Sequence, residues 1–182
     1  MPKVAIITGA PNDHSRLNGI LNYALTVFRE EGVSSEVIKV HELPAEDLIT
    51  ANFDSLAINE ANKMIKNSDG LVVLTPVYKA SYSGILKTYL DLMPQKILED
   101  KIILPLVIGG SFGHLLTIEY ALNPVLSALG ASHVVNGVFT IDHHIERKGK
   151  NQFTIQKEAQ HRLKKGLDQF VKEIKISTPL IQ

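Results

Sequence analysis

Apolar runs of strand length alternate with segments whose apolar residues recur at helical spacing, and this alternation constrains the fold more than any other feature. The run from Gly70 to Leu74 is rich in branched residues and is bounded by an Asp-Gly turn, as a buried strand is. Elsewhere Leu17, Leu21 and Phe28 fall on one helical face, and Gly32 ends that helix. The predicted strands cover residues 3–8, 36–40, 70–74, 102–108 and 134–141, and a last helix is predicted over 155–174.

Strands that are separated by helices predict a parallel sheet with helices on both faces. Five strands of this length favour an α/β fold with a doubly wound, flavodoxin-like, five-stranded parallel sheet. No internal repeat, linker or low-complexity segment interrupts the pattern. We therefore predict a single domain over residues 1–176 and a C-terminal tail over residues 177–182.

Composition excludes several classes of function. The 182 residues are 45% hydrophobic and 21% charged, which is typical of a globular domain with a sizeable core. Nineteen acidic and nineteen basic residues cancel, so neither a nucleic-acid surface nor an anionic membrane surface is indicated. The absence of cysteine excludes thiol catalysis. No apolar run has membrane length and Met1-Pro2-Lys3 leads straight into a strand, so a cytoplasmic location is expected.

The segment TPVYKASYSG, residues 75–84, follows a central strand and leads into a predicted helix that Ser81 or Ser83 would cap. It is predicted to be a loop at the carboxyl end of the strand, where open α/β sheets bind ligands. A rigid backbone at Pro76 and two tyrosine rings suit a flat aromatic ligand. The candidate binding residues here are Pro76, Val77, Tyr78, Lys79 and Ser81. The alternative is an ordinary turn whose tyrosines cover the sheet edge.

The loop after the first strand, residues 9–19, is the second candidate. Its amides and the helix N-terminus form a natural anion site, to which Ser15, Arg16 and Asn18 add directed donors. The loop lacks GxGxxG and GK[ST], so a monophosphate is favoured over a dinucleotide or a nucleoside triphosphate. The alternative is that Ser15 or Asn18 merely caps the helix while Arg16 is solvated.

The third candidate is the run from Gly109 to His114, again at the carboxyl end of a strand. Its closely spaced glycines indicate backbone that lies near a ligand or needs positive φ angles. The candidate residues are Gly109, Gly110, Ser111 and His114. Three loops therefore converge on one edge of the sheet, one suited to phosphate and two to a flat ring. This combination favours flavin mononucleotide (FMN) as the ligand.

Three stretches resemble one family. They are TPVYKASYSGILKTYLDLMP from Thr75, LPLVIGGSFGHLL from Leu104 and EYALNPVLSALGA from Glu119. They are similar to the NADPH-dependent FMN reductases of alkanesulfonate monooxygenase systems. The resemblance implies a flavodoxin-like fold, reduction of FMN by NADPH, and transfer of reduced flavin to a partner monooxygenase that cleaves a carbon–sulfur bond. It also implies a homo-oligomer, a homodimer or a homotetramer.

The chain departs from this family in the phosphate loop. Relatives carry a GSPR-type start, whereas this chain has Gly9-Ala10-Pro11-Asn12. Ala10 lacks a hydroxyl and Asn12 lacks a charge, which argues against tight phosphate binding. Weak binding would suit a protein that releases its flavin.

Pro124 requires an adjustment in the helix that follows Gly110. It has no amide hydrogen for the carbonyl of Tyr120, so either a simple kink or a wide π turn is expected. The resemblance favours the π turn, because related reductases have a tyrosine insertion at the position of Tyr120, near the subunit interface and the flavin. It implies that Tyr120 promotes flavin release. The alternative is a core or interface tyrosine beside an ordinary kink.

No catalytic base or nucleophile is expected, since flavin and nicotinamide carry the hydride chemistry. The backbone of residues 76–79 would bind the edge of the flavin ring, while Tyr78 and Gly109-Gly110 frame its reactive face. Lys79 would either stabilise charge on the reduced ring or contact the NADPH phosphate. No metal site is predicted, because the adjacent His143 and His144 would point to opposite faces of a strand.

Two other functions stay open at this point. The same fold could reduce quinones or azo dyes with flavin as a permanent prosthetic group. It could also be a flavodoxin-type electron carrier, although the balanced charge argues against the docking surface of such carriers. The apolar residues Tyr89, Leu92 and Met93 are candidates for a subunit interface.

Overall fold

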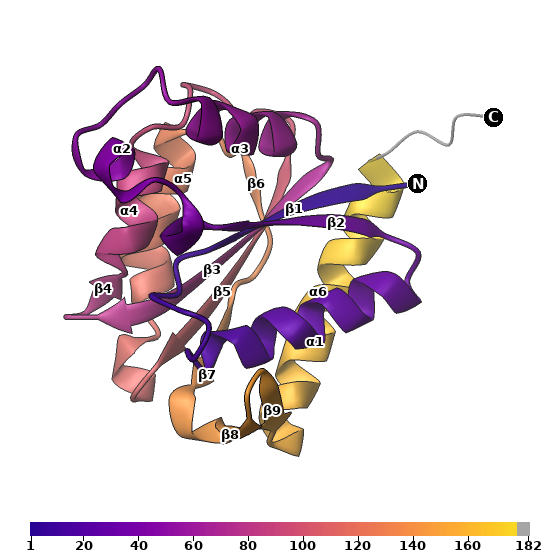
Figure 1. Ribbon diagram of the computed structural model, residues 1–182. Helices are drawn as coiled ribbons and strands as arrows, with labels where there is room; N and C mark the ends of the chain where they lie inside the picture. The colour runs from indigo at the N-terminus through magenta and orange to yellow at the C-terminus, as the bar shows by residue number, and fades with distance from the viewer. Residues whose placement is uncertain (178–182) are drawn as a thin grey trace.

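A computed structural model of the protein describes residues 1–177 and shows a twisted sheet between two layers of helices (Figure 1). The strand order is β2-β1-β3-β5-β6, with β7 also paired to β5, and all of these pairings are parallel. This is the doubly wound order of the flavodoxin-like fold. The predicted fold class is therefore confirmed.

The main parallel strands lie close to the five predicted strands. They are β1 (Lys3–Thr8), β2 (Ser34–Lys39), β3 (Gly70–Tyr78), β5 (Ile102–Gly109), β6 (His133–Val134) and β7 (Val138–Ile141). Along β1 the side chains alternate, so that Ala5 and Ile7 pack into one core while Val4 and Ile6 pack into the other. Burial on both faces explains why β1, β3 and β5 are almost uniformly apolar.

The helices divide between the two faces. The longer ones are α1 (Leu17–Glu30), α3 (Leu56–Lys66), α4 (Gly84–Leu90), α5 (Asn123–Ala128) and α6 (Lys157–Ser177), and α2 (Ala45–Ile49) is short. Helices α1 and α6 cover one face, and their Phe28 and Phe170 rings lie 6.0 Å apart in its core. Helices α2 to α5 cover the other face (Figure 1).

The structure differs from the sequence prediction in several places. The strand predicted over 134–141 is interrupted, and its two parts β6 and β7 share the fifth position beside β5. Residues 75–78 belong to β3 rather than to a loop. A hairpin of β8 (Ile145–Gly149) and β9 (Gln152–Ile155) was not predicted. Helix α6 continues to Ser177, one residue past the predicted domain end, and the rest of the predicted tail lies outside the described residues.

Tyr89, Leu92 and Met93 do not form an exposed patch, which corrects their assignment as interface candidates. They are 0%, 3% and 5% exposed and belong to the core between α4 and the sheet. The Tyr89 hydroxyl donates a hydrogen bond of 3.0 Å to Asn62 Oδ1 inside that core. Within residues 1–177, none of the helices combines the length and the apolar character that crossing a bilayer requires.

Candidate functional site

The segment predicted to hold a flat ring forms a tight hairpin. Strand β3 runs on to Tyr78 and pairs antiparallel with β4 (Ser81–Tyr82). Lys79 and Ala80, which form the turn, have φ angles of 49° and 64°. Such angles are costly for residues other than glycine and tend to occur at functional sites. The hairpin projects Tyr78 and Lys79 into solvent at the carboxyl edge of the sheet, while Pro76 is buried beneath them.

A set of buried hydrogen bonds fixes this hairpin to the loop after β1. Ser83 Oγ donates to the Gly9 carbonyl at 2.9 Å and accepts from the Leu86 amide at 3.1 Å, so it also caps α4. The Ser83 amide in turn donates to Thr75 Oγ1 at 3.0 Å. A Cβ on Gly9 would lie 2.7 Å from Ser83 Oγ, so only glycine fits there. Of the two predicted caps for this helix, Ser83 is the one the structure uses.

The predicted phosphate loop is held in shape by its own side chains. Asn12 Oδ1 accepts from the His14 amide at 2.9 Å, and Asn18 Nδ2 donates to the Asn12 carbonyl at 3.2 Å. Ser15 Oγ accepts from the Leu17 amide at 3.2 Å. Helix α1 then begins at Leu17, with Arg16 at the N-cap position and no side chain capping it. The amides of Leu17, Asn18 and Gly19 have acceptors in Ser15 and Arg16, so an anionic group here would gain from the positive end of the 14-residue helix and would compete for these amides.

Each cation beside this loop already has a carboxylate partner. Arg16 Nη1 lies 3.6 Å from Asp142 Oδ2, in the segment that follows β7. Lys39 Nζ, at the end of β2, lies 2.9 Å from both Asp13 and Glu42. The Lys39 ammonium holds the pKa of the Asp13 carboxyl below its usual range, so this carboxylate is ionised at neutral pH. A bound phosphate would compete with these carboxylates, which favours weak binding.

Two groups of potential metal ligands lie near the same loop. Asp13, His41 and Glu42 lie close enough together to share an ion, but Lys39 contacts both carboxylates there. His143 and His144 lie in a 3-10 turn rather than in a strand, and their rings meet edge to face at 4.7 Å. The predicted opposite orientation of these two histidines is therefore wrong, because they do not lie in extended backbone.

The third predicted loop lies at the end of β5, and its first two residues have very different surroundings. Gly109 is buried, and a Cβ there would lie 2.9 Å from Phe139 Cζ, whereas a Cβ on Gly110 would meet nothing within 4 Å. Ser111 is exposed, and His114 is half-buried with its Nδ1 buried and unpaired among the described residues. Thr117 Oγ1 donates to the Ala80 carbonyl at 3.3 Å, which connects this loop to the hairpin.

The adjustment required by Pro124 is a π-helical turn, η3 (Ile118–Leu122), with Tyr120 at its centre. In a π turn the partner of a carbonyl is the amide five residues later, and for Tyr120 that residue is Val125, which has an amide hydrogen. The wide turn is thus the alternative that the structure adopts. The Tyr120 side chain is 79% exposed, so it is not a core residue.

The predicted residues therefore meet at one edge of the sheet, where the loops after β1, β3, β5 and β7 are linked by the contacts above. Thr75 and Asp142 also contribute to this edge, and neither was predicted from the sequence to do so. Asp142 comes directly after a strand, and that position is the signal that could have identified it. The sequence carries no comparable signal for Thr75, since its hydroxyl only accepts a hydrogen bond that shapes the hairpin.

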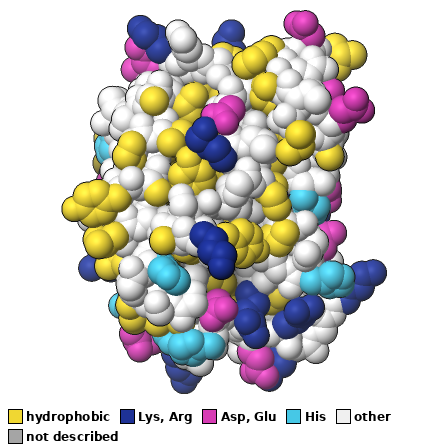
Figure 2. All heavy atoms as spheres, turned by 90° about the vertical axis from the view of Figure 1, so that its left-hand side faces the viewer, with side chains coloured by type: hydrophobic (Ala, Val, Ile, Leu, Met, Phe, Trp, Pro, Cys, Tyr) yellow, Lys and Arg dark blue, Asp and Glu magenta, His cyan; other side chains and the backbone are white. Residues whose placement is uncertain are grey.

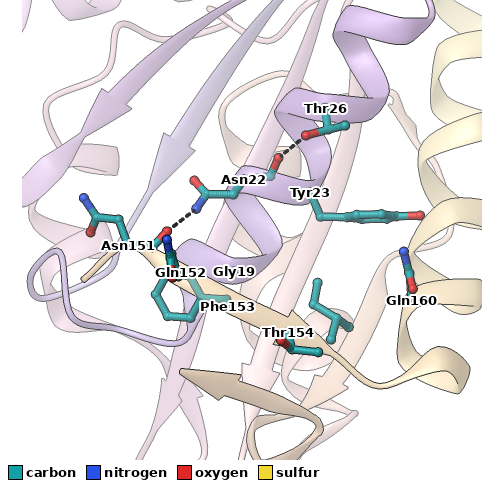
Figure 3. A pocket seen from close by; sticks show the side chains of 10 residues that line it. Gly19, Asn22, Tyr23, Thr26, Asn151, Gln152, Phe153, Thr154 and Gln160 are labelled. Carbon is teal, nitrogen blue, oxygen red and sulfur yellow. Dashed lines mark hydrogen bonds between the residues drawn. The ribbon is translucent and has the colours of Figure 1, made fainter. Parts of the chain in front are cut away.

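A groove of about 480 Å³ lies outside this site, between α1 and the β8–β9 hairpin (Figure 3). Asn22 Nδ2 donates to the Asn151 carbonyl at 3.4 Å across it, and Tyr23 and Gln160 line its other end. The residues that line the groove are uncharged. It therefore offers no charge to a phosphate, and the candidate site stays at the carboxyl edge of the sheet.

The strand order defines a class of protein, the flavodoxin-like α/β proteins, in which ligands bind at the carboxyl edge of the sheet. Sequence comparison is more specific. Residues 2–146 match the family of NADPH-dependent FMN reductases, and the chain belongs to this family. It is accordingly an oxidoreductase that uses FMN and NADPH.

Individual relatives agree with this assignment. The chain is 43% identical to an FMN reductase (NADPH) of Escherichia coli, over 92% of this chain and 87% of the relative. It is 40% identical to an FMN reductase (NADPH) of Pseudomonas putida, over 92% and 85% of the two chains. Among solved structures, an NADH:FMN oxidoreductase in its apo form superposes with a TM-score of 0.83 at 32% identity, over 95% and 90% of the chains. These relatives favour a reductase over the electron-carrier alternative.

Proposed function

We propose that this protein reduces FMN with NADPH and releases the reduced flavin to a partner monooxygenase that acts on alkanesulfonates, in the cytoplasm. The observation that carries the release step is the pairing of Arg16 with Asp142. Because the Asp142 carboxylate already pairs with the Arg16 guanidinium, a flavin phosphate would gain less binding free energy there than beside an unpaired arginine. Flavin that is held weakly behaves as a substrate rather than as a prosthetic group.

FMN, when bound, supplies the ring that accepts a hydride from NADPH. The start of α1 would hold the phosphate, together with Ser15, Arg16 and Asn18. The hairpin residues Pro76, Val77, Tyr78, Lys79 and Ser81 would hold the edge of the ring with main-chain groups.

The loop after β5 would complete the ring site. Gly110 leaves open space in which backbone approaches the ring, and Gly109, Ser111 and His114 shape the same loop. The exposed ammonium of Lys79 would stabilise negative charge on the reduced ring. The role of the protein would therefore be to orient FMN and NADPH and to place a positive charge near the ring.

We also propose that the protein forms a homo-oligomer. Figure 2 shows hydrophobic side chains across the face formed by α2, α4 and α5. Tyr120 in η3 is 79% exposed and Ile49 in α2 is 76% exposed. Exposed apolar residues of this size favour contact with a second copy of the chain.

The test is anaerobic NADPH oxidation by the flavin-stripped protein, with and without added FMN. We expect turnover only with FMN, and reduced FMN in molar excess over the enzyme. Turnover that requires a quinone or an azo dye, with flavin retained on the protein, would support the prosthetic-group alternative instead. Adding a purified alkanesulfonate monooxygenase and its sulfonate then tests the partner, because sulfite should form only when both proteins are present.

A further inference from the structure

His41 connects the short turn after β2 to the phosphate loop after β1. Strands β1 and β2 pair in parallel with Thr8 opposite Lys39, so the segments that leave these two strands lie side by side. The 3-10 turn η1 (Val40–Glu42) begins directly after Lys39, and Val40 anchors it in the core. The half-buried ring of His41 follows and contacts the phosphate loop.

The carbonyl of Ala10 accepts a hydrogen bond from this ring. His41 Nδ1 lies 3.1 Å from the Ala10 oxygen. Because a carbonyl oxygen only accepts, Nδ1 must carry the hydrogen, as it can in the neutral and in the protonated ring. Ala10 has no exposed surface, so its carbonyl cannot exchange this bond for one to bulk water. The buried carbonyl therefore depends on His41 for a donor.

The loop has little of its own with which to fix this peptide. Ala10 has no polar side chain, and Pro11 has no amide hydrogen. The Ala10 amide donates to Thr8 Oγ1 at 3.3 Å. Side chains at the ends of β1 and β2 therefore bind both main-chain polar groups of Ala10. Without the imidazole, the carbonyl would have to turn toward another donor, and the peptide between residues 10 and 11 would turn with it.

The contacts of Asp13 with the same turn are more exposed. Asp13 Oδ1 lies 2.9 Å from Lys39 Nζ and 3.8 Å from His41 Nε2, on a side chain that is 53% exposed. Exposed ion pairs contribute little to holding a loop, whereas a buried carbonyl constrains it strongly. The bond between His41 and Ala10 is therefore the contact from η1 that matters for the shape of the loop.

We propose that His41 is a positioning residue for FMN. Through the Ala10 carbonyl it holds the loop in the shape that accepts the flavin phosphate, and it needs no contact with the flavin itself. The bond also shields the negative end of a carbonyl that would otherwise repel a phosphate in the same loop. This proposal rests on the function proposed above, because it takes the phosphate of FMN to bind at this loop.

The test is titration of the flavin-stripped, full-length protein with FMN and with riboflavin, followed by flavin fluorescence. His41→Leu keeps a side chain of similar size but removes the donor, and should weaken FMN binding by about three- to tenfold. Riboflavin, which has no phosphate, should bind about as it does to the wild type. His41→Asn keeps a nitrogen donor at the δ position and should restore FMN binding to within about twofold of the wild type.

His133→Leu is the matched control for the exchange of histidine for leucine. His133 lies in β6 opposite Ile102, at the start of β5 and therefore at the other edge of the sheet. Its replacement should leave both affinities unchanged.

Three outcomes would overturn the role of His41. FMN affinity would be unchanged in His41→Leu, or His41→Asn would bind FMN as weakly as His41→Leu, or FMN and riboflavin would weaken equally, as in a general disturbance of the fold. Arg16→Gln separates this role from the phosphate site. Selective loss of FMN binding in Arg16→Gln alone would overturn only the role of His41, whereas no selective loss in either variant would overturn the proposed phosphate site as well.

Discussion

Gly109 and Gly110 are neighbours in sequence, but their surroundings differ. Alanine at position 109 would place its Cβ 2.9 Å from Phe139 Cζ, within a buried part of β5. We expect Gly109→Ala to lower the free energy of unfolding by about 1–3 kcal/mol, as overpacking does. Urea denaturation of the apo protein measures this change.

Gly110→Ala is the matched control for stability and a separate test of the flavin site. A Cβ there meets nothing within 4 Å, so unfolding should change by less than about 0.5 kcal/mol. If backbone at Gly110 approaches the flavin ring, the same substitution should raise the KM for FMN several-fold. Unchanged FMN kinetics in a stable Gly110→Ala protein would exclude this residue from the ring site.

The Arg16–Asp142 pair leads to opposite predictions for its two members. Arg16→Gln removes the positive charge of this pair, which would attract the phosphate, and should weaken FMN binding by about tenfold. Asp142→Asn frees Arg16 and removes a like charge, so FMN binding should tighten by about two- to fivefold, a small effect because both groups are partly exposed. Quenching of flavin fluorescence during titration measures both affinities.

Riboflavin, which lacks the phosphate, is the control ligand for this pair. Its affinity should not change in either variant, because neither residue is placed at the ring. Equal weakening of FMN and riboflavin in Arg16→Gln would instead indicate a disturbed loop.

At the scale of the element, the π turn η3 connects the hairpin of the proposed flavin site to the surface. Thr117, immediately before it, donates to Ala80 in the hairpin turn, and Tyr120 projects outward from its centre. We expect Tyr120→Ala to retain more flavin through purification, because the turn would no longer favour release. The retained flavin is measured by the absorbance of the purified protein near 450 nm (roughly the flavin band), relative to protein content.

Tyr23→Ala is a suitable control for this experiment. Tyr23 is a half-buried aromatic residue on α1, away from the hairpin and the π turn. Its loss should leave flavin content unchanged. Equal flavin content in Tyr120→Ala and the wild type would contradict a role of Tyr120 in release.

At the scale of the whole molecule, the exposed apolar face predicts self-association. Leu116, beside the π turn, is 57% exposed, and a lysine there would place a charge in the proposed interface. We expect a dimer or a tetramer for the wild type, and Leu116→Lys to shift it toward the monomer in light scattering after gel filtration. Ile176→Lys, on α6 across the sheet, is 73% exposed and should leave the mass unchanged. A monomeric wild type would exclude the oligomer.

Most of the sheet could be predicted from sequence because β1, β3 and β5 are buried on both faces. Their side chains, such as Val72 and Val73, must all be apolar whichever face they reach, so the pattern is visible in the chain. The hairpin over 145–155 has no such run. Its exposed face is polar, and its burial depends on Ile145 and Phe153 meeting Gly19 of α1. That contact is distant in sequence.

The sequence by itself determined the order of the main strands and the helices between them, the three segments that follow β1, β3 and β5 as candidate binding residues, and the need for some adjustment of the helix before Pro124. These properties depend on local chemistry: apolar runs, glycine, and the missing amide of proline. Tertiary structure alone decided that Ser83 bonds to Gly9, that Asp142 reaches Arg16, and that Arg162 lies over the ring of Phe112. Each of these contacts joins residues far apart in the chain, and only the packing of the completed sheet and helices brings them together.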